Sequence, residues 1–125
     1  LEAFQSLYGR SPTHVDSHQH AHSAPDVFLR LPKNLPLRRP GSVRAHLVAR
    51  RFRTTDSFHS IVRIHPLLGG EGLEGVVRAA THSTVEIMVH PSFPRELPVL
   101  LSDEWRDCIG TAPLGSFADL AARGT

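Results

Sequence analysis

Five side chains that can bind a metal ion or carry a proton fall on alternate residues near the start of the sequence. The stretch THVDSHQHAH, residues 13–22, holds four of the nine histidines of the chain and one aspartate. These residues are His14, Asp16, His18, His20 and His22. Because imidazole titrates near neutral pH, such a density gains little in a core or on an ordinary surface. It predicts a site that holds a divalent metal ion or transfers a proton.

The spacing also predicts that these side chains share one side of an extended segment. Alternate residues of a strand point the same way, so Asp16 would project together with His14, His18 and His20. Imidazole nitrogen suits zinc and similar ions, and a carboxylate either binds the ion or orients a ligating ring. Because the strand must bend where it ends, we expect one metal ligand and one acid–base residue. The alternative is a histidine-rich loop that binds metal adventitiously or not at all.

Two further candidates follow predicted strands. His90 ends the alternating segment STVEIMVH, and Pro91 stops the strand there. This position gives His90 more weight than a lone histidine would carry. Asp56, in TTDSF, is predicted to follow the strand that begins at Phe52, although an exposed loop acid explains it equally well.

The predicted secondary structure alternates between helices and strands. Helical spacing and capping residues predict helices over 1–8, from Ser42 to residue 50, over 71–81, from Ser102 to residue 109 with Gly110 beyond its end, and from Ser116 onward. Gly9 would end the first helix, and Ser116 with Asp119 forms a capping box for the last. Strands are predicted at 13–17, 83–91 and 113–117, and residues 52–58 are predicted to form a strand and its exit loop. A short extended piece is predicted at 27–31 inside a proline-rich loop.

This alternation predicts an α/β protein with a mostly parallel sheet, folded as a single domain over 1–125. In such folds the reactive residues gather at the carboxyl ends of the strands. DSHQHAH (16–22) and MVHP (88–91) both follow predicted strands. We therefore expect the two histidine sites to lie on one face of the sheet.

Composition narrows the class of protein further. The 125 residues are enough for one domain with one core, and the formal charge is only +2. Cys108 is the only cysteine, so the chain has no internal disulfide and we expect a reducing, cytoplasmic environment. No apolar run approaches the roughly 20 residues that span a bilayer.

Six arginines fall within sixteen residues and could contact nucleic acid: Arg38, Arg39, Arg44, Arg50, Arg51 and Arg53. We favour a solvated helix face and expect no nucleic-acid partner. Several enzyme signatures are absent, namely a phosphate-binding glycine loop, a GxSxG nucleophile turn, paired zinc-binding cysteines and HEXXH.

Several segments of the sequence, taken in order, resemble the YdjC-like carbohydrate deacetylases, also called the ChbG/HpnK family. The DSH-x-H motif together with the later HP motif makes the resemblance specific. The matching segments are YGRSPTHVDSHQHAH (8–22), RLP (30–32), FRTTDSF (52–58), VEIMVHPSFP (85–94) and GSFADL (115–120).

The resemblance implies a (β/α) barrel-like enzyme that hydrolyses N-acetyl groups on amino sugars with one divalent metal ion, magnesium or zinc. In this family the ion is held by an aspartate of an Asp-Asp motif, a histidine of a G-x-H segment and the first histidine of DSH-x-H. Only the last has a counterpart here, which is His18. His20 and His90 match other active-site positions and are our candidates for catalytic residues. Asp16 would orient a ligand rather than bind the ion.

Two departures from the family pattern limit what these 125 residues can do alone. The Asp-Asp and G-x-H segments have no counterpart, so the chain resembles the C-terminal half of a family member. Only SAPDVFL (23–29) joins the histidine cluster to RLP, where the family has a helix and a strand. We therefore expect a partial barrel that is inactive by itself, whose unpaired strand edges favour a homo-oligomer. The alternatives are a non-catalytic remnant and, less favoured, a basic nucleic-acid-binding module.

Overall fold

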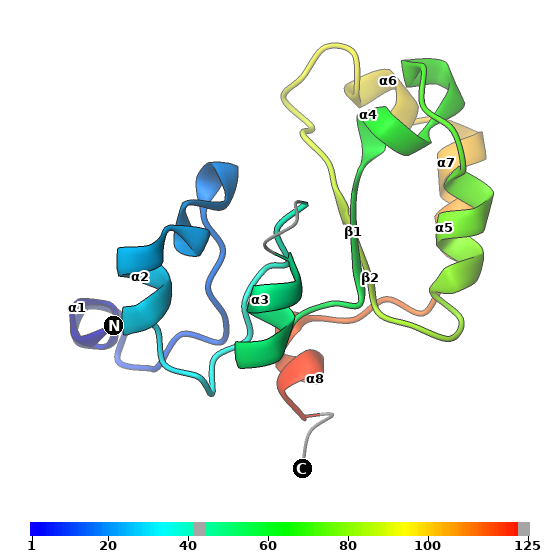
Figure 1. Ribbon diagram of the computed structural model, residues 1–125. Coiled ribbons are helices and arrows are strands. Elements are labelled where there is room, and N and C mark those ends of the chain that lie inside the picture. Colours follow the sequence, from blue (N-terminus) through cyan, green and yellow to red (C-terminus); the bar gives the residue numbers. More distant parts are fainter. Residues whose placement is uncertain (42–44, 123–125) are drawn as a thin grey trace. The chain divides into compact units, whose positions relative to one another are not determined.

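The structure, a computed structural model, describes residues 1–41 and 45–122 (Figure 1). The chain divides into two compact units, which we describe separately. The first contains residues 1–54 and 115–125, and the second contains residues 55–114. Ser42, the predicted start of a helix, and Arg44 lie outside the described residues.

The first unit is built from short helices around two extended segments. The helices are α1 (Glu2–Tyr8), η1 (His18–Ser23), α2 (Pro25–Arg30), α3 (Ala45–Arg51) and α8 (Phe117–Ala122). As predicted, α1 ends at Gly9, whose φ of 64° is left-handed and whose N–H donates to the carbonyl of Gln5. The predicted capping box is also confirmed, because Ser116 and Asp119 bond reciprocally at the start of α8.

The core of the first unit forms where distant segments are held together by backbone hydrogen bonds. The N–H of Leu37 donates to the carbonyl of Arg53 at 2.8 Å, and Val15 forms a parallel bridge with Leu37. Leu37, Val48 and Phe52 are buried there, with Val15 and the half-buried Phe28 and Leu31 packed against them. The strand predicted at 13–17 is thus reduced to a single bridge.

Two predictions for the first unit and its border are wrong. Residues 27–31, predicted to be extended, lie largely in α2, whose first residue is Pro25 and whose first turn carries Asp26. Proline suits this position because the first helical N–H has no partner within the helix. The strand predicted at 113–117 does not form, since residues 113–116 are irregular and Phe117 begins α8.

The second unit is a parallel strand–helix–strand motif with helices beside it. Strands β1 (Ser57–Ser60) and β2 (Val85–Met88) pair in parallel, from Ser57 opposite Val85 to Ser60 opposite Met88. Between them run α4 (Ile61–Ile64), η2 (Pro66–Leu68) and α5 (Leu73–Ala79), and after them α6 (Leu97–Leu100) and α7 (Asp103–Gly110). Figure 1 shows α5 and α7 side by side next to the strands.

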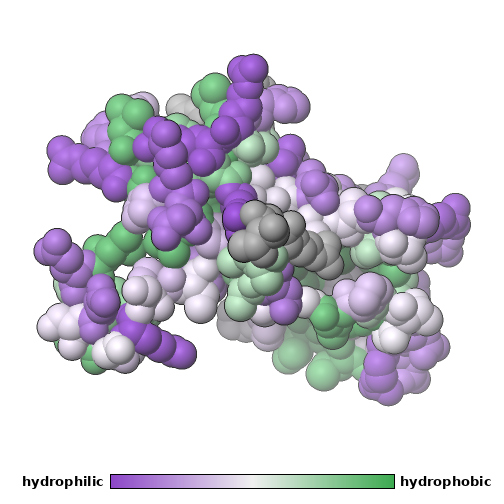
Figure 2. All heavy atoms as spheres, turned by 90° about the horizontal axis from the view of Figure 1, so that it is seen from below, coloured by the Kyte–Doolittle hydropathy of each residue, from purple (hydrophilic) through white to green (hydrophobic). Residues whose placement is uncertain are grey.

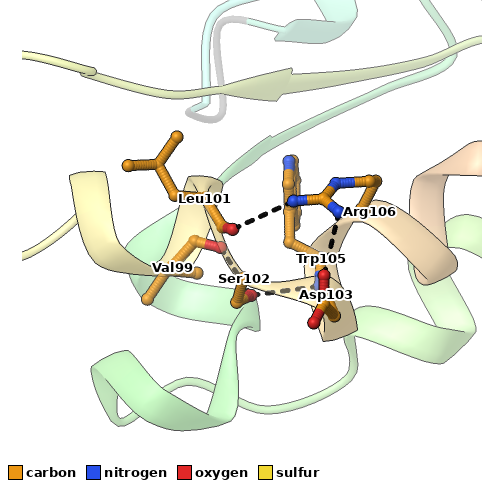
Figure 3. A network of polar contacts seen from close by, with 6 residues as sticks. All are labelled: Val99, Leu101, Ser102, Asp103, Trp105 and Arg106. Carbon is orange, nitrogen blue, oxygen red and sulfur yellow. Dashed lines mark hydrogen bonds and ion pairs between the residues drawn. The ribbon is translucent and has the colours of Figure 1, made fainter.

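Apolar side chains from the helices form the core of this unit, which consists of Ile61, Ile64, Leu68, Leu73, Val99 and Trp105. Figure 3 shows how Trp105 is placed: the Ser102 hydroxyl accepts from the Trp105 N–H at 3.2 Å and donates to the Val99 carbonyl at 2.7 Å. Arg106 reaches back to Asp103 and to the carbonyl of Leu101. These contacts confirm that Ser102 caps the helix predicted to follow it. Gly110, predicted to lie beyond the end of this helix, is instead the last residue of α7.

One turn in this unit requires glycine. A Cβ atom on Gly70 would lie 2.3 Å from the carbonyl carbon of Arg63, which no side chain can tolerate. The chain passes over α4 there and returns toward α5, with Glu71 N–H bonded to the Arg63 carbonyl at 3.1 Å. Only glycine permits this close approach of the turn to the backbone of α4.

The α/β class and the parallel pairing of strands are confirmed, with strand β1 starting five residues later than the predicted strand at Phe52. The barrel-like closure and the single-domain organisation stay predictions.

Within residues 1–41 and 45–122, no helix is long and apolar enough to cross a membrane. Figure 2 shows hydrophobic side chains among hydrophilic ones at the surface; Leu7, Leu29 and Leu114 are among the most exposed.

Candidate functional site

The histidine-rich segment forms a tight turn, which we call the histidine turn (residues 16–23). Its backbone is extended at Ser17 and then enters η1, where Gln19 and His20 have left-handed φ angles of 52° and 57°. Left-handed geometry is unfavourable for residues with a Cβ atom, by about 1–2 kcal/mol each. The predicted alternation therefore stops at Ser17, and His18 and His20 do not continue a strand side with His14 and Asp16.

His22 anchors this turn from inside. Its ring is buried, with only 1% of the residue exposed, and its Nδ1 lies 2.7 Å from the Ser17 hydroxyl. The same hydroxyl accepts from the backbone N–H of His22 at 2.9 Å. Because Ser17 Oγ accepts one hydrogen from the backbone, its own hydrogen is available for the ring nitrogen. Burial lowers the pKa of His22, although the backbone of Arg38 opposes the shift.

His20 is half-buried and lies against His22. The two rings meet edge to face, with 5.8 Å between their centres. Burial lowers the pKa of His20, the charge of Arg38 lowers it further, and Asp16 opposes both. These shifts favour the neutral form of the imidazole.

The carboxylate of Asp16 binds a cation of the chain. One guanidinium nitrogen of Arg38 lies 3.0 Å from each of its two oxygens. The predicted role of Asp16, to orient the ring of His18, stays a prediction. His18 itself is exposed, at the first position of η1.

A metal ion needs several donors in one place. Among residues 1–41 and 45–122, no three or more His, Cys, Asp or Glu side chains gather so as to hold one. His18 fits as a single exposed nitrogen ligand, the one that the resemblance assigns to it. The other ligands would have to come from outside the described residues, as the missing Asp-Asp and G-x-H segments imply.

His14, the remaining member of the alternating set, packs against the terminal helix. Its ring stacks on Phe117 with 4.3 Å between ring centres and 7° between ring planes, and its Nδ1 lies 3.0 Å from the Thr13 hydroxyl. These contacts give His14 a structural role within the first unit.

In the second unit, His90 follows β2 at the carboxyl end of the parallel pair, as predicted. It is held by Glu96, whose side chain is only 1% exposed. One carboxylate oxygen accepts the backbone N–H of His90 at 2.5 Å, and the other lies 3.1 Å from Nδ1 of the ring. We call these two residues the His90–Glu96 pair.

A surface pocket of about 330 Å³ opens beside this pair. The ring of Phe93 stacks on that of His90, with 4.6 Å between centres and 15° between planes. Ser60, at the carboxyl end of β1, also lines the pocket, together with the apolar side chains of Val62, Leu68 and Pro94. A half-exposed imidazole with a buried carboxylate partner in a largely apolar pocket is an arrangement suited to proton transfer.

Asp56 does not belong to this pocket. It precedes β1 instead of following a strand. Its hydrogen bonds to Thr84 join the two parallel strands at their amino ends. Its carboxylate accepts from the Thr84 backbone N–H at 2.8 Å and from the Thr84 hydroxyl at 2.7 Å. The sequence prediction placed Asp56 at the wrong end of the strand because β1 begins later than predicted.

Sequence reasoning missed two residues that position candidates. Glu96 lies six residues after His90, in the segment PRELP, and only the signal of an acid among apolar residues and prolines could have indicated its burial. Ser17 sits inside the DSH-x-H motif and fixes His22. Both depend on turns whose geometry local patterns do not give.

The arginine-rich stretch is partly used inside the first unit. Arg38 pairs with Asp16, and Arg51 lies over the rings of Phe28 and Phe52 at 5.4 Å and donates to the Leu29 carbonyl. Arg53 donates to the Ala121 carbonyl. These three arginines therefore have partners within the first unit, and the expected absence of a nucleic-acid partner stays a prediction.

Comparison with known proteins gives a consistent family. A family model described as YdjC-like protein matches residues 1–111. Chitooligosaccharide deacetylases from Yersinia pestis (strain Pestoides F) and Yersinia pseudotuberculosis serotype O:1b (strain IP 31758) are each 31% identical to the chain over 148 aligned residues. No solved structure matches the chain.

The alignment covers 95% of this chain but only 57% of each of those relatives. The chain therefore spans little more than half of their length. The alignment is also longer than the 125 residues of the chain, so the relatives carry residues with no counterpart here.

Proposed function

We propose that this chain, which belongs to the YdjC-like protein family, is part of a metal-dependent hydrolase that removes N-acetyl groups from amino sugars. The observation that carries the proposal is the His90–Glu96 pair, a positioned imidazole beside a pocket at the carboxyl end of parallel strands. The printed name of the curated relatives, chitooligosaccharide deacetylase, supports an N-acetylated oligosaccharide as the substrate class.

The chain would contribute three histidines to the reaction. His18 would hold the divalent ion, magnesium or zinc, which when bound supplies Lewis-acid polarisation of the acetyl carbonyl. His90, with Nδ1 held by Glu96, would donate a proton from Nε2 to the departing sugar amine. His20 would stabilise the oxyanion or take the place of His90 as the proton donor.

The same proposal implies that the rest of the site lies outside the chain described here. Only one metal ligand, His18, is assigned to these residues, and the carboxylate that acts as general base would come from the part of the relatives that this chain does not cover. The 125 residues alone should therefore release no acetate. A non-catalytic remnant that keeps the fold is the competing proposal.

Acetate release by the full-length protein tests this function. The substrate is an N-acetylated chitooligosaccharide, and the variants are His18→Ala and His90→Ala. Each should lower kcat/KM by roughly 100-fold or more, the contribution of a positioned acid–base or metal-binding group. His82→Ala, which removes an exposed histidine between α5 and β2, is the matched control and should keep full activity. Near-normal activity of His18→Ala would overturn the metal assignment, and a full-length protein that releases no acetate would favour the remnant.

A further inference from the structure

We propose that Glu96 is a positioning residue that fixes His90 in one neutral tautomer, with hydrogen on Nδ1 and a free electron pair on Nε2. The inference rests on the proposed function only for its catalytic consequence. Its structural part concerns two residues of the second unit and can be measured without any substrate.

The loop between the two residues brings the carboxylate back onto His90. The N–H of Phe93 donates to the His90 carbonyl at 2.9 Å, and the N–H groups of Glu96 and Leu97 both donate to the Phe93 carbonyl, at 3.0 and 3.1 Å. These successive turns place the Glu96 side chain inside the loop, where it is buried. A buried carboxylate needs hydrogen-bond donors, and His90 supplies them.

The two contacts between Glu96 and His90, one to the backbone N–H and one to the ring, together determine which ring nitrogen carries hydrogen. A backbone N–H can only donate, so the oxygen that lies 2.5 Å from the His90 nitrogen must accept. The second oxygen of an ionised carboxylate can also only accept, and it lies 3.1 Å from Nδ1. Nδ1 must then carry a hydrogen, and in the neutral ring Nε2 is left without one.

The ring plane is restricted from a second direction. Phe93 stacks on His90 with 15° between the ring planes, so rotation of the imidazole would break both the stacking and the bond to Glu96. The His90 side chain remains 34% exposed and lines the pocket. Ordering of this kind by a carboxylate on the far nitrogen is the usual way in which proteins direct the other nitrogen of a histidine.

This arrangement specifies the proton that His90 would give up. In the protonated ring both nitrogens carry hydrogen, and Glu96 retains the one on Nδ1. The transfer breaks the Nε2–H bond and forms an N–H bond on the leaving amine, and the neutral ring left behind is the tautomer that Glu96 favours. Glu96 therefore assists the transfer without contacting the substrate.

Replacement of Glu96 by glutamine gives a sharp prediction. A glutamine side chain offers one oxygen and one NH2 group, which can only donate. If its oxygen keeps the backbone N–H of His90, its NH2 group faces Nδ1 and requires the free electron pair to be there. The neutral ring of Glu96→Gln should then carry its hydrogen on Nε2, which is the opposite tautomer.

Nitrogen NMR of this chain, labelled with ¹⁵N-histidine and observed at a pH where the ring is neutral, measures the tautomer directly. The His90 signals are assigned by their loss in His90→Asn. We expect hydrogen on Nδ1 in the unchanged chain and hydrogen on Nε2 in Glu96→Gln. Glu104→Gln, at an exposed glutamate of α7, is the control and should leave the pattern unchanged.

The measurement on the unchanged chain can contradict the inference by itself. The test therefore remains decisive even if Glu96→Gln does not fold. Hydrogen on Nε2, or an equal mixture of tautomers, in the unchanged chain would show that Glu96 does not position His90. In the full-length protein, Glu96→Gln should lower kcat roughly 10- to 100-fold with little change in KM, and Glu96→Asp should recover part of the loss. If the tautomer is as expected but the full-length protein releases no acetate, the proposed function fails and the positioning role stands.

Discussion

The histidine turn and the His90–Glu96 pair differ in the contacts that hold their imidazole rings. In the turn, several titratable groups are close in sequence, but their side chains have different surroundings. His22 is buried against Ser17, Asp16 is bound by Arg38, and His18 is exposed. In the second unit a single histidine is held by one buried carboxylate six residues away. The density of histidines therefore marks a region, whereas the hydrogen-bond partner decides what each ring can do.

The largest predicted effect is the difference between replacing Glu96 and replacing Asp16 in the free energy of unfolding. Glu96→Ala leaves the backbone N–H and the ring of His90 without their buried acceptor and opens a void. It should destabilise the chain by about 3 kcal/mol, measured by urea denaturation. Asp16→Ala removes a carboxylate that is more than one-third exposed, and it should cost well under 1 kcal/mol. Equal losses for the two variants would mean that the two carboxylates are not held differently.

Within the histidine turn, His22 should matter more for stability than its neighbours. His22→Ala removes a buried ring and its bond to Ser17, so we expect a loss of about 2 kcal/mol in the same denaturation experiment. His18→Ala, four residues earlier and exposed, is the matched control with almost no effect on stability. A large loss for His18→Ala would show that its ring is packed in the folded chain.

The lowered pKa of His22 should also make stability depend on pH. Burial lowers the folded-state pKa of His22 below the 6.5 of an unperturbed histidine, so the unfolded chain takes up the proton first as the pH falls. The stability present above pH 6.5 is then lost as the pH falls from 6.5 to the folded-state pKa, by about 1.4 kcal/mol for each unit between the two values.

His20, whose pKa is lowered as well, acts in the same direction. Denaturation measured from pH 5 to 8 should therefore show a smaller acid loss in His22→Gln than in the unchanged chain. His82→Gln, at an exposed position, is the control. The pH prediction is wrong if His22→Gln and the unchanged chain lose stability in parallel.

The smallest effect concerns the left-handed backbone of the turn. Gln19 has a φ of 52°, which glycine adopts without a steric penalty, so Gln19→Gly should stabilise the chain by about 0.5–1 kcal/mol. The matched control is Gln5→Gly inside α1, where the same change should destabilise by up to about 1 kcal/mol. Destabilisation by Gln19→Gly would indicate that the turn has another geometry.

Sequence patterns predicted the elements whose signals are local. The glycine that ends α1, the capping box of α8, the serine that caps α7 and the alternating residues of β2 all act within a few residues of the element they define. The boundary of β1 depends on its pairing with β2, and the helix at Pro25 was obscured by the prolines around it. Such cases depend on tertiary contacts that propensity does not contain.

The candidate site shows the same limit. His18, His20 and His90 could be named from residue type, spacing and family resemblance, and the position of His90 after β2 is confirmed. The burial of Glu96 and the left-handed turn at Gln19 could not be predicted, because each follows from a loop closing on itself. The residues that position each candidate histidine were therefore harder to predict than the candidate histidine itself.

The most direct test of the account is a double-mutant cycle on acetate release by the full-length protein. If His18 and His90 serve the same reaction, each single replacement by alanine should remove most of kcat/KM, and the double variant should be little worse than either single one. Losses that multiply in the double variant would contradict the claim that both residues act in one step. Full activity in His90→Ala would contradict it more simply.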